Sequence, residues 1–215
     1  AEQWEFEVEI EGRVRNHWHL WIYPALSSIT ASVYDPAETL SFPVHHPRVA
    51  ADSLTAPVDQ VGDEKVVIAG AYTPELDAYL RAGGKAVLIQ NGEGGLPTRA
   101  VPFWRESIKL LYDHPIMRAF PHEGHADLQF YHLATDHAFD SAAFQEMDVT
   151  PIMRRLDARL FTTLDYIVEA RRGAGWMLAS TLRFWGGAGD QVRGLATNPA
   201  GAFLLRQMID YLMGA

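Results

Sequence analysis

The sequence predicts an α/β fold with a doubly wound, mainly parallel sheet, preceded by a short β hairpin. Apolar runs at residues 66–68 and 86–89 have no polar interruption, which is typical of parallel strands buried on both faces. Residues 73–84 between them carry helix signals, so the three segments form a strand–helix–strand unit with a right-handed crossover. Residues 4–11 instead alternate between apolar and acidic side chains, the period of a half-buried strand.

The N-terminal hairpin is predicted from two apolar segments separated by a turn. Trp4, Phe6, Val8 and Ile10 alternate with glutamates, and a second apolar run over residues 18–23 ends at Pro24. An isolated hairpin is only marginally stable in water, so its apolar face needs a partner sheet. Because the chain opens directly on this strand without a methionine, we expect that it was cut from a longer polypeptide.

The remaining elements follow from caps, breakers and apolar patterns. Residues 25–62 are rich in proline and glycine and are predicted to be a connector, with one candidate strand at 29–34. Strands are expected at residues 161–167 and 176–182, joined by a tight turn over 171–175. Residues 198–212 have the cap and the apolar stripe of a terminal helix.

Caps and breakers also set the bounds of the first helix. Thr73 is a typical N-cap, and Pro74 suits the first helical position because it has no N–H group to leave unpaired. Gly83 and Gly84 favour an end of this helix after residue 82.

Composition excludes several classes of function. Eighteen Lys and Arg against 27 Asp and Glu give a net charge of −9, which argues against a nucleic-acid partner. No apolar run is long enough to span a membrane, so we predict a soluble protein without membrane contact. The absence of cysteine excludes disulfides, thiolate metal sites and cysteine catalysis. It permits any redox compartment, among which we favour the cytoplasm.

Several segments resemble the C-terminal part of bacterial family-2 glycoside hydrolases, the β-galactosidase and β-glucuronidase-like enzymes. NHWHLWIYP, residues 16–24, is similar to the last strand of an immunoglobulin-like β-sandwich. Other segments are similar to a class I glutamine-amidotransferase-like domain appended to some of these enzymes: LDAYLRAGGKAVLI, HPIMRAFPHEG, RLFTTLDYIVEARRGAGWMLAS and NPAGAFLLRQMIDYL. The resemblance implies a terminal sandwich hairpin at 1–24, a connector at 25–62 and a flavodoxin-like, amidotransferase-like α/β domain at 63–215.

The function that this resemblance implies is that of a non-catalytic accessory region in carbohydrate metabolism. The glycosidase carboxylates of the family lie in a separate (β/α)₈ barrel, to which nothing in this chain corresponds. The implied tasks are packing against the remaining domains of the parent glycosidase, subunit assembly, with a homo-oligomer as one outcome, or shaping of the substrate cleft. Neither a catalytic residue nor a cofactor is assigned to this chain.

Amidotransferase activity is predicted to be lost. Class I glutamine amidotransferases place a cysteine after a central strand and activate it with a late histidine and glutamate. Here Gln90 or Asn91 stands at the matching strand end, and neither side chain can attack a carbonyl. Ser180 and Thr181 stand near the expected histidine and glutamate, while the last histidine of the chain is His137. No G-x-S-x-G elbow offers a serine nucleophile instead.

A carbohydrate-binding module is the alternative function. The glycine-rich loop after Ile89 leaves the carboxyl end of a strand, where open α/β sheets usually bind ligands. The candidate ligand residues are Gln90, Asn91, Gly92 and Glu93, with Trp104 as a platform. Planar amides suit sugar hydroxyls, and an aromatic ring suits the apolar face of a sugar.

A metal-dependent hydrolase built on a histidine cluster is the second alternative. His122, Glu123, His125 and His132 are residue types that bind zinc. The first two histidines are spaced i, i+3, whereas the metalloprotease helix needs i, i+4, and Pro121 and Gly124 favour a loop. The sequence therefore predicts no metal site and leaves His122, His125 and His132 as candidates.

Overall fold

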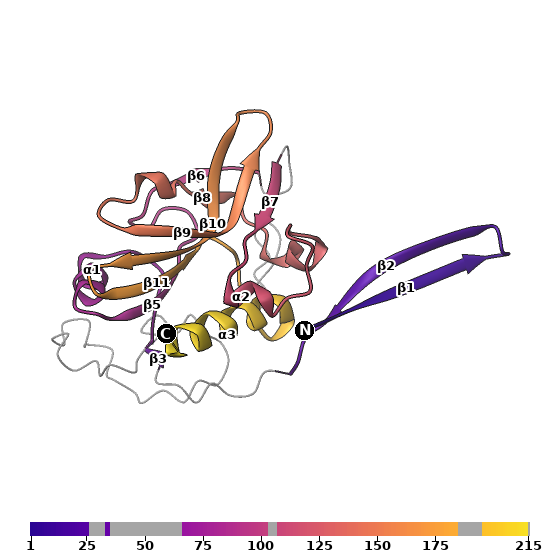
Figure 1. Ribbon diagram of the computed structural model, residues 1–215, viewed down its shortest axis with the longest axis horizontal. Helices are drawn as coiled ribbons and strands as arrows, with labels where there is room; N and C mark the ends of the chain where they lie inside the picture. The colour runs from indigo at the N-terminus through magenta and orange to yellow at the C-terminus, as the bar shows by residue number, and fades with distance from the viewer. Residues whose placement is uncertain (26–32, 35–65, 103–106, 185–194, 215) are drawn as a thin grey trace.

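The computed structural model describes residues 1–25, 33–34, 66–102, 107–184 and 195–214, and it contains two sheets in these ranges (Figure 1). The strands are β1 (Glu2–Ile10), β2 (Val14–Ile22), β3 (Val33–Tyr34), β4 (Val66–Ala69), β5 (Lys85–Ile89), β6 (Thr98–Ala100), β7 (Ser107–Leu111), β8 (His137–Phe139), β9 (Asp148–Asp157), β10 (Thr162–Arg172) and β11 (Gly175–Ser180). The α-helices are α1 (Pro74–Arg81), α2 (Pro115–Arg118) and α3 (Pro199–Gly214), with 3₁₀ turns at η3 (Leu128–Leu133), η4 (Ser141–Ala143) and η5 (Leu195–Thr197).

The larger sheet is mixed, with nine strands among the described residues. Its main path runs β3-β4-β5-β11-β10-β8-β6, while β9 pairs with β10 and β7 pairs with β9. The neighbours β3, β4, β5 and β11 are parallel, and every other pairing in this sheet is antiparallel. The prediction of a doubly wound, mainly parallel sheet is therefore wrong, since the described fold is mostly β with few helices.

The tight turn between β10 and β11 is one physical reason for the mixed sheet. Arg172 pairs with Gly175 across this turn, and the two strands continue in antiparallel register from there. Strands joined so closely can pair only antiparallel, because a parallel pair needs a long crossover, usually a helix. The short strands β6, β7 and β8 lie where the sequence showed no clear period, and they extend the antiparallel half.

The predictions of individual helices and strands hold better than the prediction of the fold class. The predicted strand–helix–strand unit is confirmed, since β4 and β5 are parallel neighbours joined through α1. Thr73 caps α1 as predicted, its hydroxyl accepting a hydrogen bond from the N–H of Leu76 at 3.3 Å. Of the candidate strand at 29–34, only Val33 and Tyr34 are described, as β3. Most of the proposed connector lies outside the described residues, and the domain division stays a prediction.

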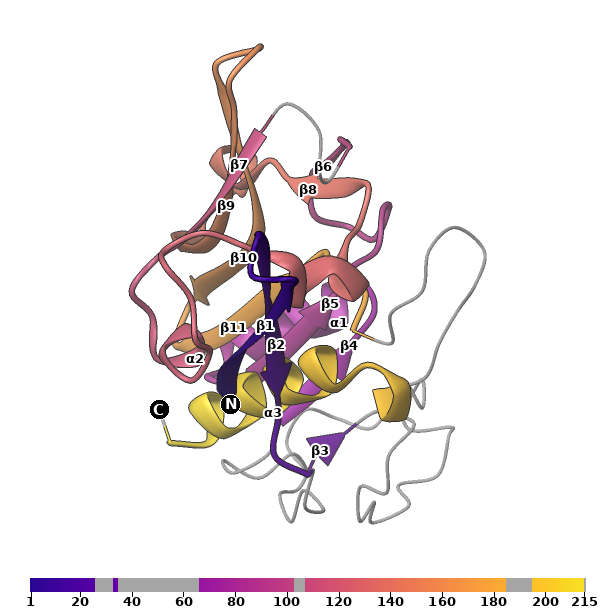
Figure 2. The ribbon, with the colours of Figure 1, turned by 90° about the vertical axis from the view of Figure 1, so that its right-hand side faces the viewer.

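The core has two parts, one on each face of the sheet. On one face, α3 lies along the strands together with α2 and η3 (Figure 2), burying a cluster that includes Phe130, Tyr166 and Leu204. The other face is covered by α1, whose Leu76 and Leu80 pack among residues of β5, β10 and β11. None of the helices in the described ranges is long and apolar enough to cross a membrane.

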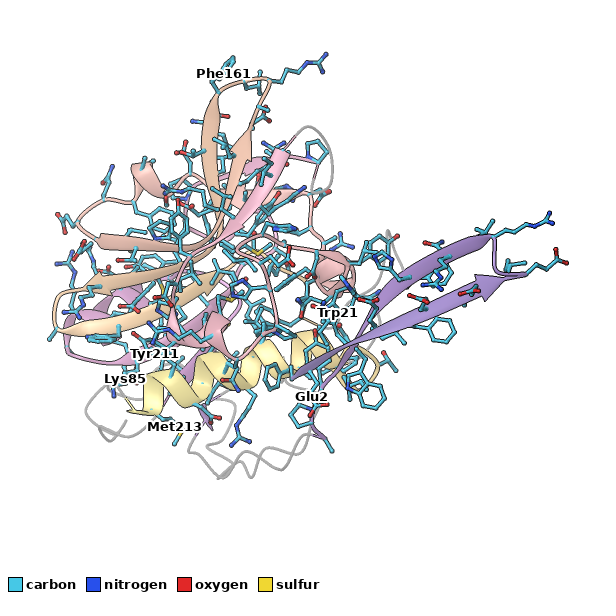
Figure 3. All side chains as sticks on the ribbon, turned by 45° about the vertical axis from the view of Figure 1, so that its right-hand side comes forward. Glu2, Trp21, Lys85, Phe161, Tyr211 and Met213 are labelled. Carbon is cyan, nitrogen blue, oxygen red and sulfur yellow. The ribbon has the colours of Figure 1, made fainter. Side chains whose placement is uncertain are left out.

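The predicted N-terminal hairpin is confirmed, since β1 and β2 pair antiparallel, and it projects from this body (Figure 1). Its base is tied down by Tyr23, whose hydroxyl donates to Oε1 of Gln129 at 2.8 Å. The ring of Tyr23 also contacts Phe120 and Phe203, with centroids 6.0 and 5.5 Å away. Farther from this base, β1 and β2 expose their large apolar side chains to solvent (Figure 3).

Candidate functional site

The loop after Ile89 is organised around a buried glutamine. Gln90 is 0% exposed, and its Nε2 donates to the carbonyl oxygens of Gly92 and Leu96 at 3.0 and 2.8 Å. Its Oε1 accepts from the N–H of Leu96 at 3.2 Å. These three bonds close the loop around the side chain of Gln90. Gln90 therefore shapes the loop from within, and its amide is already occupied.

The other candidate ligand residues are divided between the two sides of this loop. Asn91 and Glu93 are exposed, whereas Gly92 is buried and its carbonyl also accepts from the hydroxyl of Thr98 at 3.1 Å. Trp104 lies outside the described residues. The structure thus does not bring the amides of Gln90 and Asn91 together on one surface, and ligand binding by these residues stays a prediction.

The late strand β11 reaches the same region with hydroxyl side chains that are already bonded. Ser180 is the register partner of Ile89, and its hydroxyl accepts from the N–H of Leu182 at 3.1 Å. The hydroxyl of Thr181 donates to the carbonyl of His137 at 2.9 Å. His137, on β8, also lies in this region, which the order of the residues in the sequence did not reveal. Its ring is about 3.8 Å from the position that a Cβ on Gly92 would take. Its Nδ1 is 2.8 Å from a carboxylate oxygen of Asp136.

His122, Glu123 and His125 lie in a loop, as Pro121 and Gly124 predicted, whereas His132 lies in η3. Nδ1 of His122 accepts from the N–H of Gly124 at 3.0 Å, and Nδ1 of His125 lies 3.4 Å from the carbonyl of Glu123. The ring of His132 packs against Tyr131 instead. Among the residues that the structure describes, no three potential ligands come close enough to hold a metal ion.

A pocket of about 550 Å³ opens beside the far end of the loop that follows Ile89. Tyr72 and Gly95 to Pro97 of its wall come from the segments that follow the parallel strands β4 and β5. Arg172 instead pairs with Gly175, next to Trp176, whose register partner is Lys85 at the start of β5. Three segments and the end of β10 form its wall: Tyr72, Thr73, Pro74 and Asp77 at the start of α1, Gly95, Leu96 and Pro97 in the loop, Ala143, Phe144, Gln145 and Met147 before β9, and Arg172.

Gly95 is required where two of these segments meet. The N–H of Tyr72 donates to the carbonyl of Gly94 at 2.6 Å, which brings the segment before α1 against the loop. Gly95 has a φ of +97°, and a Cβ on it would lie 2.1 Å from the carbonyl oxygen of Tyr72. Only glycine fits both the backbone conformation and the space.

Two carboxylates and two guanidinium groups form a network at the pocket. Asp77 accepts from Nε of Arg172 at 2.6 Å, from Nε of Arg81 at 2.8 Å and from the hydroxyl of Tyr72. Nη1 of Arg172 donates to the carbonyl and to a carboxylate oxygen of Glu146 at 2.9 and 2.8 Å. Two positive and two negative charges balance, and Nη2 of Arg172 takes no part in these bonds.

The network fixes the protonation states at the pocket. Arg172, and then Tyr72 and Arg81, hold the pKa of Asp77 well below its ordinary value, so that this carboxylate stays ionised. Burial, followed by the hydrogen bond to Asp77, raises the pKa of Tyr72 to about 12 and keeps its hydroxyl protonated. Asp77 and Arg172 are 95 residues apart, so no spacing rule could have paired them.

A second buried group that the sequence did not reveal is Lys109, on β7. It is 4% exposed and lies opposite Arg155 of β9, which is 2% exposed. Burial, and then the charge of Arg155, lower the pKa of Lys109 to about 8. An ammonium with such a pKa loses its proton at a pH where exposed lysines remain charged.

We expect Lys109 to titrate near pH 8 in the folded protein. Because its pKa is about 8 when folded and about 10.5 when unfolded, the free energy of unfolding should rise as the pH increases from 8 to 10.5. The chain has three lysines, so ¹³C NMR of the lysine Cε groups can follow each. Lys109→Met should remove the resonance that titrates near pH 8 and flatten this rise in stability. A resonance that titrates above pH 10 at this position would contradict the expectation.

Comparison with known proteins places the folded body in a family. A family model described as "Domain of unknown function (DUF8487)" matches residues 67–215. The chain belongs to the DUF8487 family. The match spans β4 to the end of α3, and therefore includes the pocket, its charge network and the loop after Ile89.

Other comparisons add little to the DUF8487 assignment. No curated protein matches the chain. Among solved structures, the chain is similar to "Cytoplasmic Protein STM3548 from Salmonella typhimurium", with a TM-score of 0.44 and 10% sequence identity over 98% of this chain and 96% of that one.

Proposed function

We propose that this chain is a non-catalytic accessory region of a family-2-like glycoside hydrolase, and that it serves interdomain packing. Its β1–β2 hairpin would dock on an apolar sheet in the remaining domains of the parent glycosidase. The resemblance of residues 16–24 to a sandwich strand supports the choice of a sheet as the partner. The proposal keeps the cytoplasmic location favoured from the sequence.

The observation that carries this proposal is the exposed apolar face of the hairpin. In the antiparallel register, Trp4 pairs with Leu20 and Phe6 with Trp18, so these four side chains share one face. Their exposed fractions lie between 47 and 57%. The pairs Glu5 with His19 and Glu7 with His17 form the opposite, polar face. A hairpin with one apolar and one polar face needs a partner that covers the apolar face.

The exposed area is large enough for a specific contact. Seven large apolar side chains of this hairpin are 44–59% exposed: Trp4, Phe6, Ile10, Val14, Trp18, Leu20 and Ile22. Together they offer on the order of 700 Å², close to the roughly 800 Å² that each partner buries in a standard interface. Large contiguous apolar patches on soluble proteins usually mark interaction sites. Sheet-on-sheet packing would cover this face with side chains from the partner.

The hydrogen bonds at the ends of β5 and β11 support a non-catalytic role. All three hydrogen bonds of the Gln90 side chain go to its own loop, and the hydroxyls of Ser180 and Thr181 are bonded to backbone groups. His137 and Asp136 pair beside this loop, but Ser180 and Thr181, the hydroxyl residues at this strand end, are fully buried. A general base acts on a nucleophile within hydrogen-bond reach, and the hydroxyls of Ser180 and Thr181 bond to backbone groups instead.

The test compares the full-length gene product with the 215-residue chain. We expect the amide hydrogens of β1 and β2 to exchange at least about 100-fold more slowly in the full-length product, because docking buries the apolar face. The double substitution Phe6→Thr and Trp18→Thr should abolish this protection, since it removes one cross-strand pair of the docking face. Glu7→Thr with His17→Thr removes the neighbouring pair on the polar face and should leave the protection unchanged.

Four outcomes would contradict the proposal. Equal exchange in the full-length product and the chain would show that no other domain covers the hairpin. Protection in the isolated chain, together with a dimer in sedimentation, would assign the face to a second copy. Turnover of an aryl glycoside or of glutamine by the chain, or a reading frame without a glycosidase barrel, would reject the accessory role.

A further inference from the structure

The pocket beside the loop after Ile89 has the chemical features of a binding site for a small neutral ligand. Its volume of about 550 Å³ lies within the range of ligand pockets, about 300–1,000 Å³. Part of its wall, Tyr72 and Gly95 to Pro97, comes from the segments that follow β4 and β5, the side on which parallel strands usually bind ligands. Its wall comes from segments far apart in the chain, held by hydrogen bonds and a glycine contact.

The polar part of the wall places donors and acceptors side by side without net charge. Asp77 and Arg172 line the pocket as a bonded pair, with 23 and 10% of their side chains exposed. An ionised carboxylate accepts hydrogen bonds and a guanidinium donates them, so adjacent hydroxyl groups on a ligand can bond to both. The hydroxyl of Tyr72 and the exposed amide of Gln145 add further polar atoms at the same wall.

The remaining wall is apolar and partly aromatic. Phe144, Leu96 and Met147 belong to the cluster beneath α1, and Pro74 and Pro97 complete the lining. Such surfaces contact the C–H face of a ring, whereas an anion would find the guanidinium already neutralised by Asp77 and Glu146. The lining therefore favours a ring that has hydroxyl groups on its edge and an apolar face.

We propose that this pocket binds a neutral pyranoside. Asp77 and Arg172 would bond to neighbouring hydroxyl groups at the ring edge, and Phe144 with Met147 would contact the ring face. The site differs from the one expected from the sequence: Gln90 holds the loop, and Gly95 to Pro97 form the wall. The inference does not depend on the docking role of the hairpin, which lies on another element.

Isothermal titration of the 215-residue chain with methyl β-galactopyranoside and methyl β-glucopyranoside tests the proposal. We expect a dissociation constant of about 1 mM for one of them, because a monosaccharide has few atoms with which to gain affinity. Methyl β-glucuronide should bind at least about 3-fold more weakly, since the pocket has no unbalanced positive charge for its carboxylate.

Two variants locate the binding site. Met147→Trp should fill the pocket and lower affinity at least about 10-fold, while Leu160→Trp adds the same side chain at an exposed position in the β9–β10 turn and should change nothing. Gln145→Ala removes an exposed amide from the wall and should weaken binding about 3-fold without affecting folding. No heat with either neutral glycoside, tighter binding of the glucuronide, or equal binding by the folded Met147→Trp variant would overturn the proposal.

Discussion

Replacing Gly175 with alanine is expected to lower the free energy of unfolding by about 4 kcal/mol or to prevent folding altogether. A Cβ at this position would lie 2.2 Å from the carbonyl oxygen of Leu80 and 2.5 Å from that of Gly84. Both contacts are with backbone atoms, which cannot move aside as a flexible side chain does. The residue stands at the start of β11, where the end of α1 crosses the sheet.

The clash would act on the whole fold because β11 is central. It joins the parallel strand β5 to the antiparallel strand β10, and all of its residues except Trp176 are buried. Relief of the clash would require α1 to move away from β11, exposing Leu80, which is fully buried. Chemical denaturation followed by circular dichroism would measure the loss.

Gly70→Ala is the matched control for this substitution. A Cβ at Gly70 would have no heavy atom within 4 Å, and its φ lies outside the left-handed region. We expect its free energy of unfolding to stay within about 0.5 kcal/mol of the wild type. A Gly175→Ala protein as stable as the Gly70→Ala protein would show that α1 does not approach β11 as closely as described.

Removal of Asp77 is expected to have the second largest effect, with Asp77→Ala losing about 3 kcal/mol of stability. Arg172 is 10% exposed at its side chain, and Asp77 is the partner of its Nε. Without that carboxylate, a nearly buried guanidinium keeps Glu146 as its one charged partner among the described residues. Removing one partner of a nearly buried guanidinium costs more than the original ion pair contributed.

The stability that Asp77 confers should also depend on pH. Its pKa in the folded state is lowered by Arg172, Tyr72 and Arg81, so its contribution is present above the unfolded pKa of about 4 and is lost as the pH falls below it. The difference in melting temperature between wild type and Asp77→Asn should therefore be largest near pH 7 and shrink towards pH 2. A difference that stayed constant over this range would exclude the carboxylate's charge as its cause.

Arg81→Ala is the control for the buried part of the network. Arg81 bonds to the same two carboxylates, Asp77 and Glu146, but its side chain is 50% exposed. Exposed ion pairs contribute at most about 1 kcal/mol, so this variant should lose far less than Asp77→Ala. Equal losses would place the stabilising contact on the surface of α1 instead of at Arg172.

The resemblance to amidotransferase-like domains led to the wrong sheet, although several individual strands were predicted correctly. The turn over residues 171–175 was recognised, and it already requires an antiparallel pair. The segments that became β6, β7 and β8 contain three to five residues each, too few to show a period. The candidate site in the loop after Ile89 stays a prediction, and the structure turns the side chain of Gln90 into its own loop.

The sequence by itself determined the elements whose signals are local. The caps of α1, the alternation of β1 and the apolar runs of β4 and β5 depend on neighbours within a few residues, where propensity and periodicity act. Only the tertiary structure decided which strands pair, in which direction, and which side chains meet at the pocket. Asp77 and Arg172, or Gly175 and Leu80, are adjacent because the sheet brings distant segments together, and no local pattern encodes such a contact.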